Sequence, residues 1–161
     1  MRAMRRSGQE LPQEEAWALL KQGSSGVLAL LGDEEYPYAV PLSYVVYQGK
    51  IYFHCARTGH KIDAIARHEK ASFCVIAKDQ ILPEKFTTLF QSVIVFGRAR
   101  VVTEQEEIRP ILTSLGEKYS PGVPGLSEEV AGSLHRVALI ELTPERVTGK
   151  EAIELTRERR A

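Results

Sequence analysis

The chain has 161 residues, the length of a single domain that can bury its own core, and its 21 Lys and Arg residues balance its 21 Asp and Glu residues. The zero net charge excludes a global basic field of the kind that holds a nucleic-acid backbone, and a hydrophobic fraction of 43% excludes a disordered chain. Because the net charge is zero, electrostatic repulsion between copies of the chain is weak, which is a first indication of a defined protein partner.

The ends of the chain and its two cysteines indicate in which cellular compartment the protein is found. No apolar run approaches the ~20 residues that a membrane-spanning helix needs, and no apolar signal-peptide stretch follows the basic N-terminus. We therefore expect a cytoplasmic protein that binds no membrane. Cys55 and Cys74 each lie in an apolar, strand-like run, so we expect buried free thiols rather than a metal site.

The first half of the chain predicts one helix followed by three strands. The helix runs from Pro12 to Gln22, with a proline in its first turn and Gly23 as its stop. The predicted strands are Gly26–Leu31, Tyr36–Tyr47 and Lys50–Ala56. Because the short segment Gln48-Gly49 joins the last two strands, we expect them to form a hairpin.

The second half predicts two helices, three strands and a tail. In chain order these are a helix His60–His68, strands Ala71–Ala77 and Phe86–Val102, a helix Glu104–Tyr119, a strand Val137–Leu142 and a C-terminal tail 151–161, of which Arg157–Arg160 is expected to be solvated. The segment Asp79–Pro83 is expected to break the chain out of the first strand, and Pro110 to bend or split the second helix. Strands outnumber helices, and hairpins outnumber βαβ units. The sequence therefore predicts one mainly β (α+β) domain, a closed or nearly closed antiparallel barrel with its core over about 12–150.

Several enzyme signatures are missing from the sequence. No GxGxxG follows a strand, and no Walker-type loop, HExxH or GxSxG is present. No two of the four histidines have the helical spacing that would chelate a metal. A functional site must therefore be sought in segments that match none of these signatures.

The most informative segment is His54-Cys55-Ala56-Arg57-Thr58-Gly59-His60-Lys61, where a strand ends, a glycine loop follows and a helix begins. Helix N-termini present free N–H groups that hold phosphate, and Gly59 lets the backbone approach an anion closely. Lys61 adds a positive charge and Thr58 a hydroxyl. The alternative is a glycine turn with two solvated basic residues, and this segment alone leaves both interpretations open.

Two further segments favour a ligand site. In Val40-Pro41-Leu42-Ser43-Tyr44 a proline interrupts a strand pattern, where it is expected at an edge or a bulge and can free backbone groups for a ligand. The segment Phe86–Ser92 places hydroxyl and amide side chains, at Thr87, Thr88, Gln91 and Ser92, beside the aromatic Phe86 and Phe90. An ordinary barrel strand with one wet side would show the same pattern.

Together these segments resemble the FMN-binding split-barrel family related to pyridoxamine-phosphate oxidase, and within it the Nim-type branch associated with nitroimidazole resistance. The segments that carry the resemblance are Gly26–Leu30, Pro37–Tyr44, Ile51–Ala56, Gly59–Lys61, Ala71–Val75 and Ser92–Ala99. Their order and spacing cover the chain from about Arg5 to Val102, and more loosely to Lys150.

The resemblance implies a six-stranded split barrel with a few flanking helices, which forms a homodimer and binds FMN in clefts at the subunit interface. It implies flavin contacts from Val40, Pro41, Leu42, Ser43 and Tyr44, a lining from His54, Cys55 and Ala56, phosphate contacts from His60 and Lys61, and a contact from Ser92. Relatives often carry Arg where His60 stands, which implies a weaker, pH-dependent phosphate contact. The segment Leu142–Lys150 does not match the Arg-x-His ending of the vitamin B6 oxidases, so we do not expect that activity.

The function expected from this resemblance is an FMN-dependent oxidoreductase that reduces a small nitro-aromatic or quinone-like acceptor, with NAD(P)H as a candidate reductant. His54 is the candidate catalytic proton donor. Two alternatives stay open. One is a non-catalytic module that binds or stores flavin or haem, with His54, His60 or His135 as haem ligands. The other is a deazaflavin-dependent reductase on the same barrel.

Overall fold

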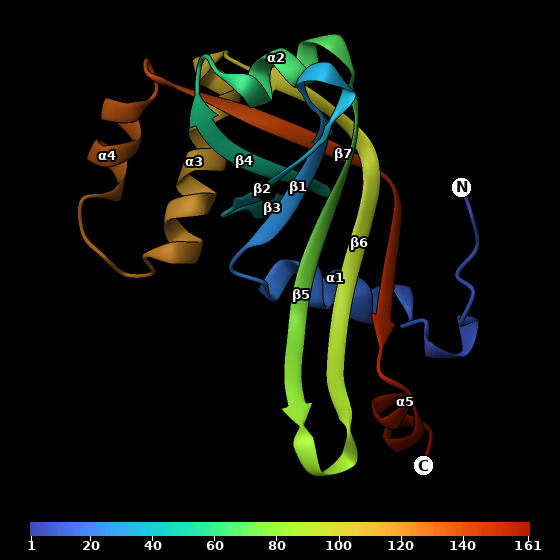
Figure 1. The fold of residues 1–161 in the computed structure, drawn as a ribbon. Coiled ribbons are helices and arrows are strands. Elements are labelled where there is room, and N and C mark those ends of the chain that lie inside the picture. Colours follow the sequence, from blue (N-terminus) through green and yellow to red (C-terminus); the bar gives the residue numbers. More distant parts are fainter.

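A computed structural model describes all residues 1–161. One antiparallel sheet of seven strands, in the order β2-β1-β5-β6-β7-β4-β3, curls around a hydrophobic core (Figure 1). The strands are β1 (Gly26–Leu31), β2 (Pro37–Leu42), β3 (Val45–Tyr47), β4 (Lys50–Ala56), β5 (Lys70–Leu82), β6 (Thr87–Val102) and β7 (Val137–Glu151). The helices are α1 (Gln13–Gln22), α2 (His60–Arg67), α3 (Gln105–Tyr119), α4 (Leu126–Ser133) and α5 (Ile153–Arg160).

The sheet has seven strands rather than the six expected, because the predicted run Tyr36–Tyr47 is divided between two partners. Its first part, β2, pairs with β1, and its second part, β3, pairs with β4. Only Ser43 and Tyr44 separate the two parts, although β2 and β3 stand at opposite ends of the strand order. The sheet therefore closes on itself through this bend, and the mainly β antiparallel fold expected from the sequence is confirmed.

Two local predictions in this region are confirmed. Pro41 lies in β2, which is an edge strand, where a missing N–H costs no ladder hydrogen bond to a second neighbour. Gln48 and Gly49 join β3 to β4 with φ angles of 48° and 76°, the two left-handed residues that a tight hairpin turn requires.

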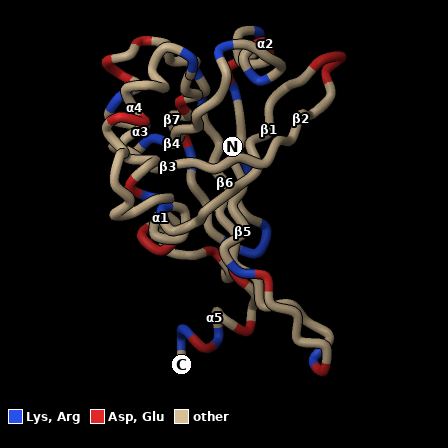
Figure 2. Tube along the Cα trace, turned by 90° about the vertical axis from the view of Figure 1, so that its left-hand side faces the viewer, with Lys and Arg blue, Asp and Glu red and all other residues tan.

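The prediction that Asp79–Pro83 ends the strand before it is wrong. Strand β5 continues through Asp79 to Leu82, and its pairing with β6 extends from Lys70 opposite Arg98 to Leu82 opposite Thr87. A register shift between Ile76 and Lys78 marks where the strand leaves the barrel. Long-range pairing with β6 therefore overrides the local polar composition, and the two strands protrude together as a hairpin (Figures 1 and 2).

Two predictions for the second half are also corrected. Helix α3 continues through Pro110 as one helix of 15 residues, so the predicted split does not occur. The predicted C-terminal tail 151–161 is instead the end of β7 and the helix α5, although Arg157–Arg160, the stretch expected to be solvated, is exposed. Its order has a physical cause, because the carboxylate of Glu151 is only 2% exposed and needs a partner. Arg159 supplies it, with two donors 2.7 and 3.0 Å from Glu151 Oε1.

Two hydrophobic cores hold the fold together. The larger core fills the barrel and includes residues of α1 and α2, such as Leu20 and Ile65. The smaller core lies between β4, β7 and the helices α3 and α4, with Leu139 and Ile108 at its centre. No helix is both long and apolar enough to cross a membrane.

Candidate functional site

The start of α2 presents a polar cradle at the end of β4. Gly59 precedes the helix with a φ of 129°, a conformation that L side chains rarely adopt, and no atom lies within 4 Å of where its Cβ would stand. No side chain caps the helix, so the first-turn N–H groups face outward without a partner from the chain. The exposed residue Thr58 adds a hydroxyl nearby. These donors fit a phosphate group.

Lys61 completes this cradle. Burial raises the pKa of the Cys55 thiol, and the positive charge of Lys61 acts in the opposite direction, which places the ammonium group near the end of β4. The ion pair formed in this region joins Asp33 to Arg67 and leaves Lys61 out. Lys61 therefore keeps its charge available for a ligand.

His60 is occupied by contacts within the chain. Its ring stacks on Tyr38, with centroids 4.1 Å apart and planes 16° from parallel. Its Nε2 accepts a hydrogen bond from the backbone N–H of Asp33 at 3.2 Å. The imidazole thus fastens α2 to the β1–β2 connection. The phosphate contact expected of His60 stays a prediction, and it would have to compete with these contacts.

Arg57, which lies in the same loop, is also engaged. Its guanidinium donates to the backbone oxygens of Val137 and Leu134, each at 3.2 Å, and so holds the loop to the connection between α4 and β7. Among the basic residues of the loop and the first turn of α2, Lys61 is therefore the one without such a structural contact.

His54 and Cys55 point to opposite faces of β4. Cys55 is half-buried and packs against the larger core together with Phe53, whereas His54 is exposed. Its cross-strand partner Leu139 belongs to the smaller core, so His54 lies on the side of β4 that faces away from the barrel interior. Ala56, at the strand end, is exposed on that same side. The catalytic role expected of His54 stays a prediction.

The residues expected along the flavin divide into two groups. Val40 and Leu42 pack their side chains against the larger core, while Pro41 and Ser43 are exposed. Tyr44 is fully buried, and its hydroxyl donates to the backbone oxygen of Leu20. Burial raises the pKa of this hydroxyl, with the neighbouring Tyr119 as a second cause.

The backbone of Tyr44 is held by two residues that sequence reasoning missed. Its N–H donates to the hydroxyl of Tyr119 at 2.9 Å, and its oxygen accepts from Lys118 Nζ at 2.8 Å. Lys118 also donates to Gly23 O at 2.6 Å and lies 4.0 Å from the centre of the Tyr44 ring. The end of α3 therefore fixes the bend between β2 and β3. No local pattern marks Lys118-Tyr119, because the contact joins segments about 75 residues apart.

The outer surface of the sheet carries an apolar patch, here called the outer face. It consists of Val27 and Leu31 on β1, Ile76 on β5, and Ile94 and Phe96 on β6, each between 37% and 69% exposed. Cross-strand pairing of Val27 with Cys74, and of Cys74 with Ile94, brings these residues to one side. A cleft on this side is lined by Arg2, Met4, Ser92, Ile94, Phe96, Arg146, Thr148 and Lys150.

Ser92 is therefore not brought together with Lys61 within one chain. Helix α2 covers the part of β6 around Ala99. Ser92 lies seven residues further along β6, which corresponds to roughly 23 Å at the rise of a strand. The predicted contact of Ser92 with the same ligand would require a second copy of the chain.

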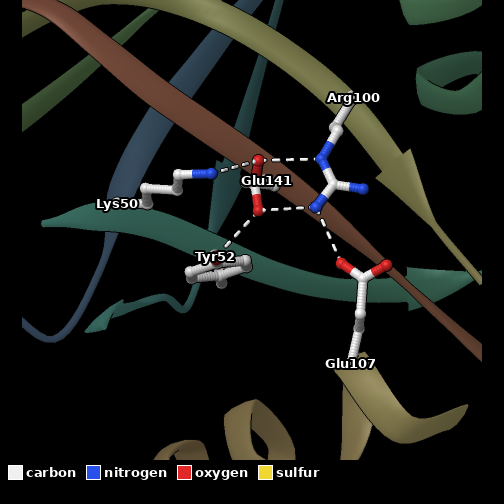
Figure 3. Close-up of polar contacts among 5 residues, drawn as sticks. All are labelled: Lys50, Tyr52, Arg100, Glu107 and Glu141. Atoms are coloured by element: carbon white, nitrogen blue, oxygen red, sulfur yellow. Dashed lines mark hydrogen bonds and ion pairs between the residues drawn. The ribbon is translucent and has the colours of Figure 1, made fainter. Parts of the chain in front are cut away.

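A charged cluster lies on the side of the sheet that faces α3 (Figure 3). The Glu141 carboxylate, only 3% exposed, accepts hydrogen bonds from Lys50 at 2.9 Å, Tyr52 at 2.8 Å and Arg100 at 2.8 and 3.0 Å. Arg100 also pairs with Glu107 at 2.7 Å. Since each charge has a partner, this cluster joins three strands to α3 and offers no free group for catalysis.

Comparison with known proteins places the fold. Residues 12–151 match the sequence profile described as pyridoxamine 5'-phosphate oxidase. No curated protein shows a significant sequence match. A conserved hypothetical protein of Mycobacterium tuberculosis has a similar structure, with a TM-score of 0.80 and 18% identity, over 92% of this chain and 90% of that one.

Two further solved structures are similar. A protein of Bacteroides thetaiotaomicron VPI-5482, described as a candidate 5-nitroimidazole antibiotic resistance protein, has a TM-score of 0.76 and 16% identity, over 88% of this chain and 86% of that one. A flavocytochrome of Azotobacter vinelandii has a TM-score of 0.75 and 18% identity, over 93% of this chain and 72% of that one. At these identities the likeness establishes a shared fold.

Proposed function

The chain belongs to the pyridoxamine 5'-phosphate oxidase family, and on that premise we propose that it is an FMN-binding oxidoreductase that reduces a small nitro-aromatic or quinone-like acceptor. The observation that carries the proposal is the cradle at the start of α2, where Gly59 gives open access to unpaired N–H groups and Lys61 keeps a free charge. The likeness to the Bacteroides protein supports the choice of acceptor.

In this proposal each residue has a defined task. Lys61, the hydroxyl of Thr58 and the first N–H groups of α2 hold the phosphate. The exposed residues Pro41, on the edge strand β2, and Ser43, just after it, would hold the ring. The bound flavin would supply the two electrons for reduction. His54 donates a proton from its imidazole to the reduced acceptor. NAD(P)H is the proposed source of the electrons.

We further propose that the active form is a homodimer that pairs through the outer face. An exposed apolar patch of a few hundred Å² is often a functional surface, such as a site of contact with another protein. A second copy would also bring Ser92 to the phosphate and ring contacts from which it is separated within one chain. Light scattering should give twice the mass of the chain, and Ile94→Asp should yield a monomer. A monomeric FMN complex of the native protein would contradict the dimer.

Titration of the apoprotein with FMN, followed by quenching of flavin fluorescence, tests the cofactor. Lys61→Met should weaken FMN binding by about 10- to 100-fold, because a charge-assisted hydrogen bond to phosphate contributes roughly 1.5–3 kcal/mol. Lys61→Arg should retain most of the affinity. The control Lys21→Met removes a lysine from the exposed side of α1 and should change nothing. Absence of FMN binding by the native protein would overturn the proposal.

A second candidate is a binding module without efficient turnover. It is favoured by two structural relatives, the flavocytochrome and a protein of Mycobacterium smegmatis described as binding FAD and haem. A Soret band, lost on substitution of His54, His60 or His135, would identify haem. Parallel titrations with FMN, FAD and a deazaflavin, followed by turnover assays with NAD(P)H, would separate this module and a deazaflavin reductase from the FMN enzyme.

A further inference from the structure

The hairpin formed by the far ends of β5 and β6, residues 78–90, extends beyond the barrel and is here called the arm. The third strand of this region, β7, pairs with β6 only as far as Gln91 opposite Glu151. Past that point the arm is a two-stranded ribbon that points away from the barrel (Figures 1 and 2). A two-stranded ribbon is marginally stable in water on its own. The length of the arm therefore predicts that one of its faces packs against another surface.

The arm carries apolar side chains that its own chain leaves in water. Phe86 at the tip is 98% exposed and Ile81 is 69% exposed. Phe86 also has a φ of 50°, in the left-handed region that bulky residues rarely occupy. A large apolar side chain in an unfavourable backbone conformation, fully exposed, contributes nothing to the stability of the isolated chain.

These side chains continue the outer face of the barrel. Along β6, residues 88, 90, 92, 94 and 96 lie on one side of the sheet, because side chains alternate. Cross-strand pairing adds Ile81 opposite Thr88 and Ile76 opposite Ser92 to that side. Phe90 confirms the direction, since its ring lies 5.6 Å from Nζ of Lys150, which lines the outer cleft. One apolar stripe therefore runs from Phe96 to the arm.

Helix α5 lies along one edge of the arm and reaches Thr87, next to the tip. The N–H of Ala152 donates to Phe90 O at 2.9 Å, and Thr87 donates to Glu154 at 3.1 Å. These contacts lie along the β6 edge and leave Phe86 and Ile81 exposed. Within the chain, these two apolar side chains therefore have no cover.

The area of the outer face indicates what covers it. The three strands that carry it, about 4.8 Å apart and crossed over the seven residues from Lys70 to Ile76, present roughly 330 Å². A stable specific interface needs about 800 Å² from each partner. The arm adds roughly 200 Å² from one ribbon face, and a partner's arm covers a similar area in return. The barrel surface alone is too small, and the arm supplies most of the difference.

We propose that the arm packs against a second copy of this chain, with Phe86 and Ile81 buried on the partner's barrel. This inference rests on the proposed homodimer and adds its main anchor outside the barrel. The symmetry of a two-fold dimer makes the arrangement reciprocal, so each barrel receives one arm and extends one.

Photo-cross-linking tests the proposal in the full-length protein. Phe86→p-benzoylphenylalanine, irradiated at a concentration where light scattering shows a dimer, should give a covalent dimer on a denaturing gel. In a mixture of ¹⁴N- and ¹⁵N-labelled protein, the cross-linked peptides should join the two isotopes. The same substitution at Val123, which is 59% exposed in the loop between α3 and α4, should give none. Cross-links confined to one chain, or none, would overturn the proposal.

Affinity measurements provide a second test that does not depend on the probe. Ile81→Ser combined with Phe86→Ser should raise the dissociation constant of the dimer at least 10-fold, because two exposed apolar side chains would no longer be buried. The control Val123→Ser should leave it unchanged. An unchanged constant in the arm variant, with a monomeric Ile94→Asp, would overturn the arm contact and keep the homodimer. A native protein that is monomeric at all concentrations would overturn both.

Discussion

Replacement of Glu141 by glutamine should destabilise the fold by about 3 kcal/mol at neutral pH. Burial by itself would raise the pKa of Glu141, but hydrogen bonds from Arg100, Lys50 and Tyr52 outweigh it and lower the pKa from 4.5 to about 2. A shift of this size corresponds to about 3 kcal/mol in favour of the ionised folded form. Glu141→Gln keeps the shape, removes the charge and leaves two cations with a neutral partner (Figure 3).

The sign of the pH dependence follows from the lowered pKa. The stabilisation by Glu141 is fully present above the unfolded-state pKa of about 4.5, and it is lost as the pH falls from there through about 2. The difference in unfolding free energy between native protein and Glu141→Gln should therefore be constant from pH 7 to 5 and shrink below pH 4.5. For a chain of this length the variant should melt about 6–12 °C lower at neutral pH.

Urea unfolding followed by circular dichroism, at a fixed protein concentration so that any dimer contributes equally, measures this difference. The matched control is Glu107→Gln, which removes the other carboxylate of Arg100. Because Glu107 is 47% exposed, that change should cost less than about 1 kcal/mol. The reasoning is refuted if Glu141→Gln unfolds within 0.5 kcal/mol of the native protein at pH 7 (roughly the precision of such measurements) or if their difference does not change with pH.

Two further predictions concern stability. Lys118→Met should cost about 2 kcal/mol in urea unfolding, because it removes the donors to the backbone oxygens of Gly23 and Tyr44 and frees the bend between β2 and β3. An unchanged midpoint would show that Tyr119 alone holds the bend. Gly97→Ala should cost about 3 kcal/mol or prevent folding, because its Cβ would overlap the backbone oxygen of Thr143, whereas Gly132→Ala, with open space on α4, should stabilise by about 0.5–1 kcal/mol. Thermal melting that ranks these two glycine variants equally would contradict the packing.

The predictable part of this fold is the part that local chemistry decides. Gly26–Leu31 has the strand composition and the flanking glycines that define its ends, and the structure matches it. The turn at Gln48-Gly49 was predictable because a tight hairpin turn needs positive φ angles, which glycine adopts without steric cost, and both residues have them. Pro41 could be placed at an edge because a proline in a central strand would break the ladder.

The unpredicted part depends on contacts between distant residues. The run Tyr36–Tyr47 has a continuous strand pattern, and only the contacts of Lys118 and Tyr119 with Tyr44 show that it changes partners midway. Strand β5 passes Asp79 because β6 continues to pair with it. Residues of this kind carry no local signal, since their role is set by a segment that lies elsewhere in the chain.

The candidate site shows the same division. Gly59, Thr58 and Lys61 could be identified because a glycine loop before a helix has a local geometry that suits an anion. The sequence could not show that His60 and Arg57 are already used, because their partners Tyr38, Asp33, Val137 and Leu134 are distant in the chain. A basic pair in the sequence thus becomes one free lysine in the structure.

This difference bears on how the site would work. A cradle with one free lysine and a set of backbone N–H groups supplies less positive charge than the His60–Lys61 pair predicted. The deficit can be met from outside the chain, because Arg2, Arg146 and Lys150 line the outer cleft next to Ser92. Of these cations, Lys150 pairs opposite Ser92 and so lies roughly 23 Å along β6 from the region that α2 covers, too far to share a phosphate within one chain. In the proposed homodimer, a partner packed on the outer face would deliver its own set of cations, and the same second copy would cover the exposed apolar surface.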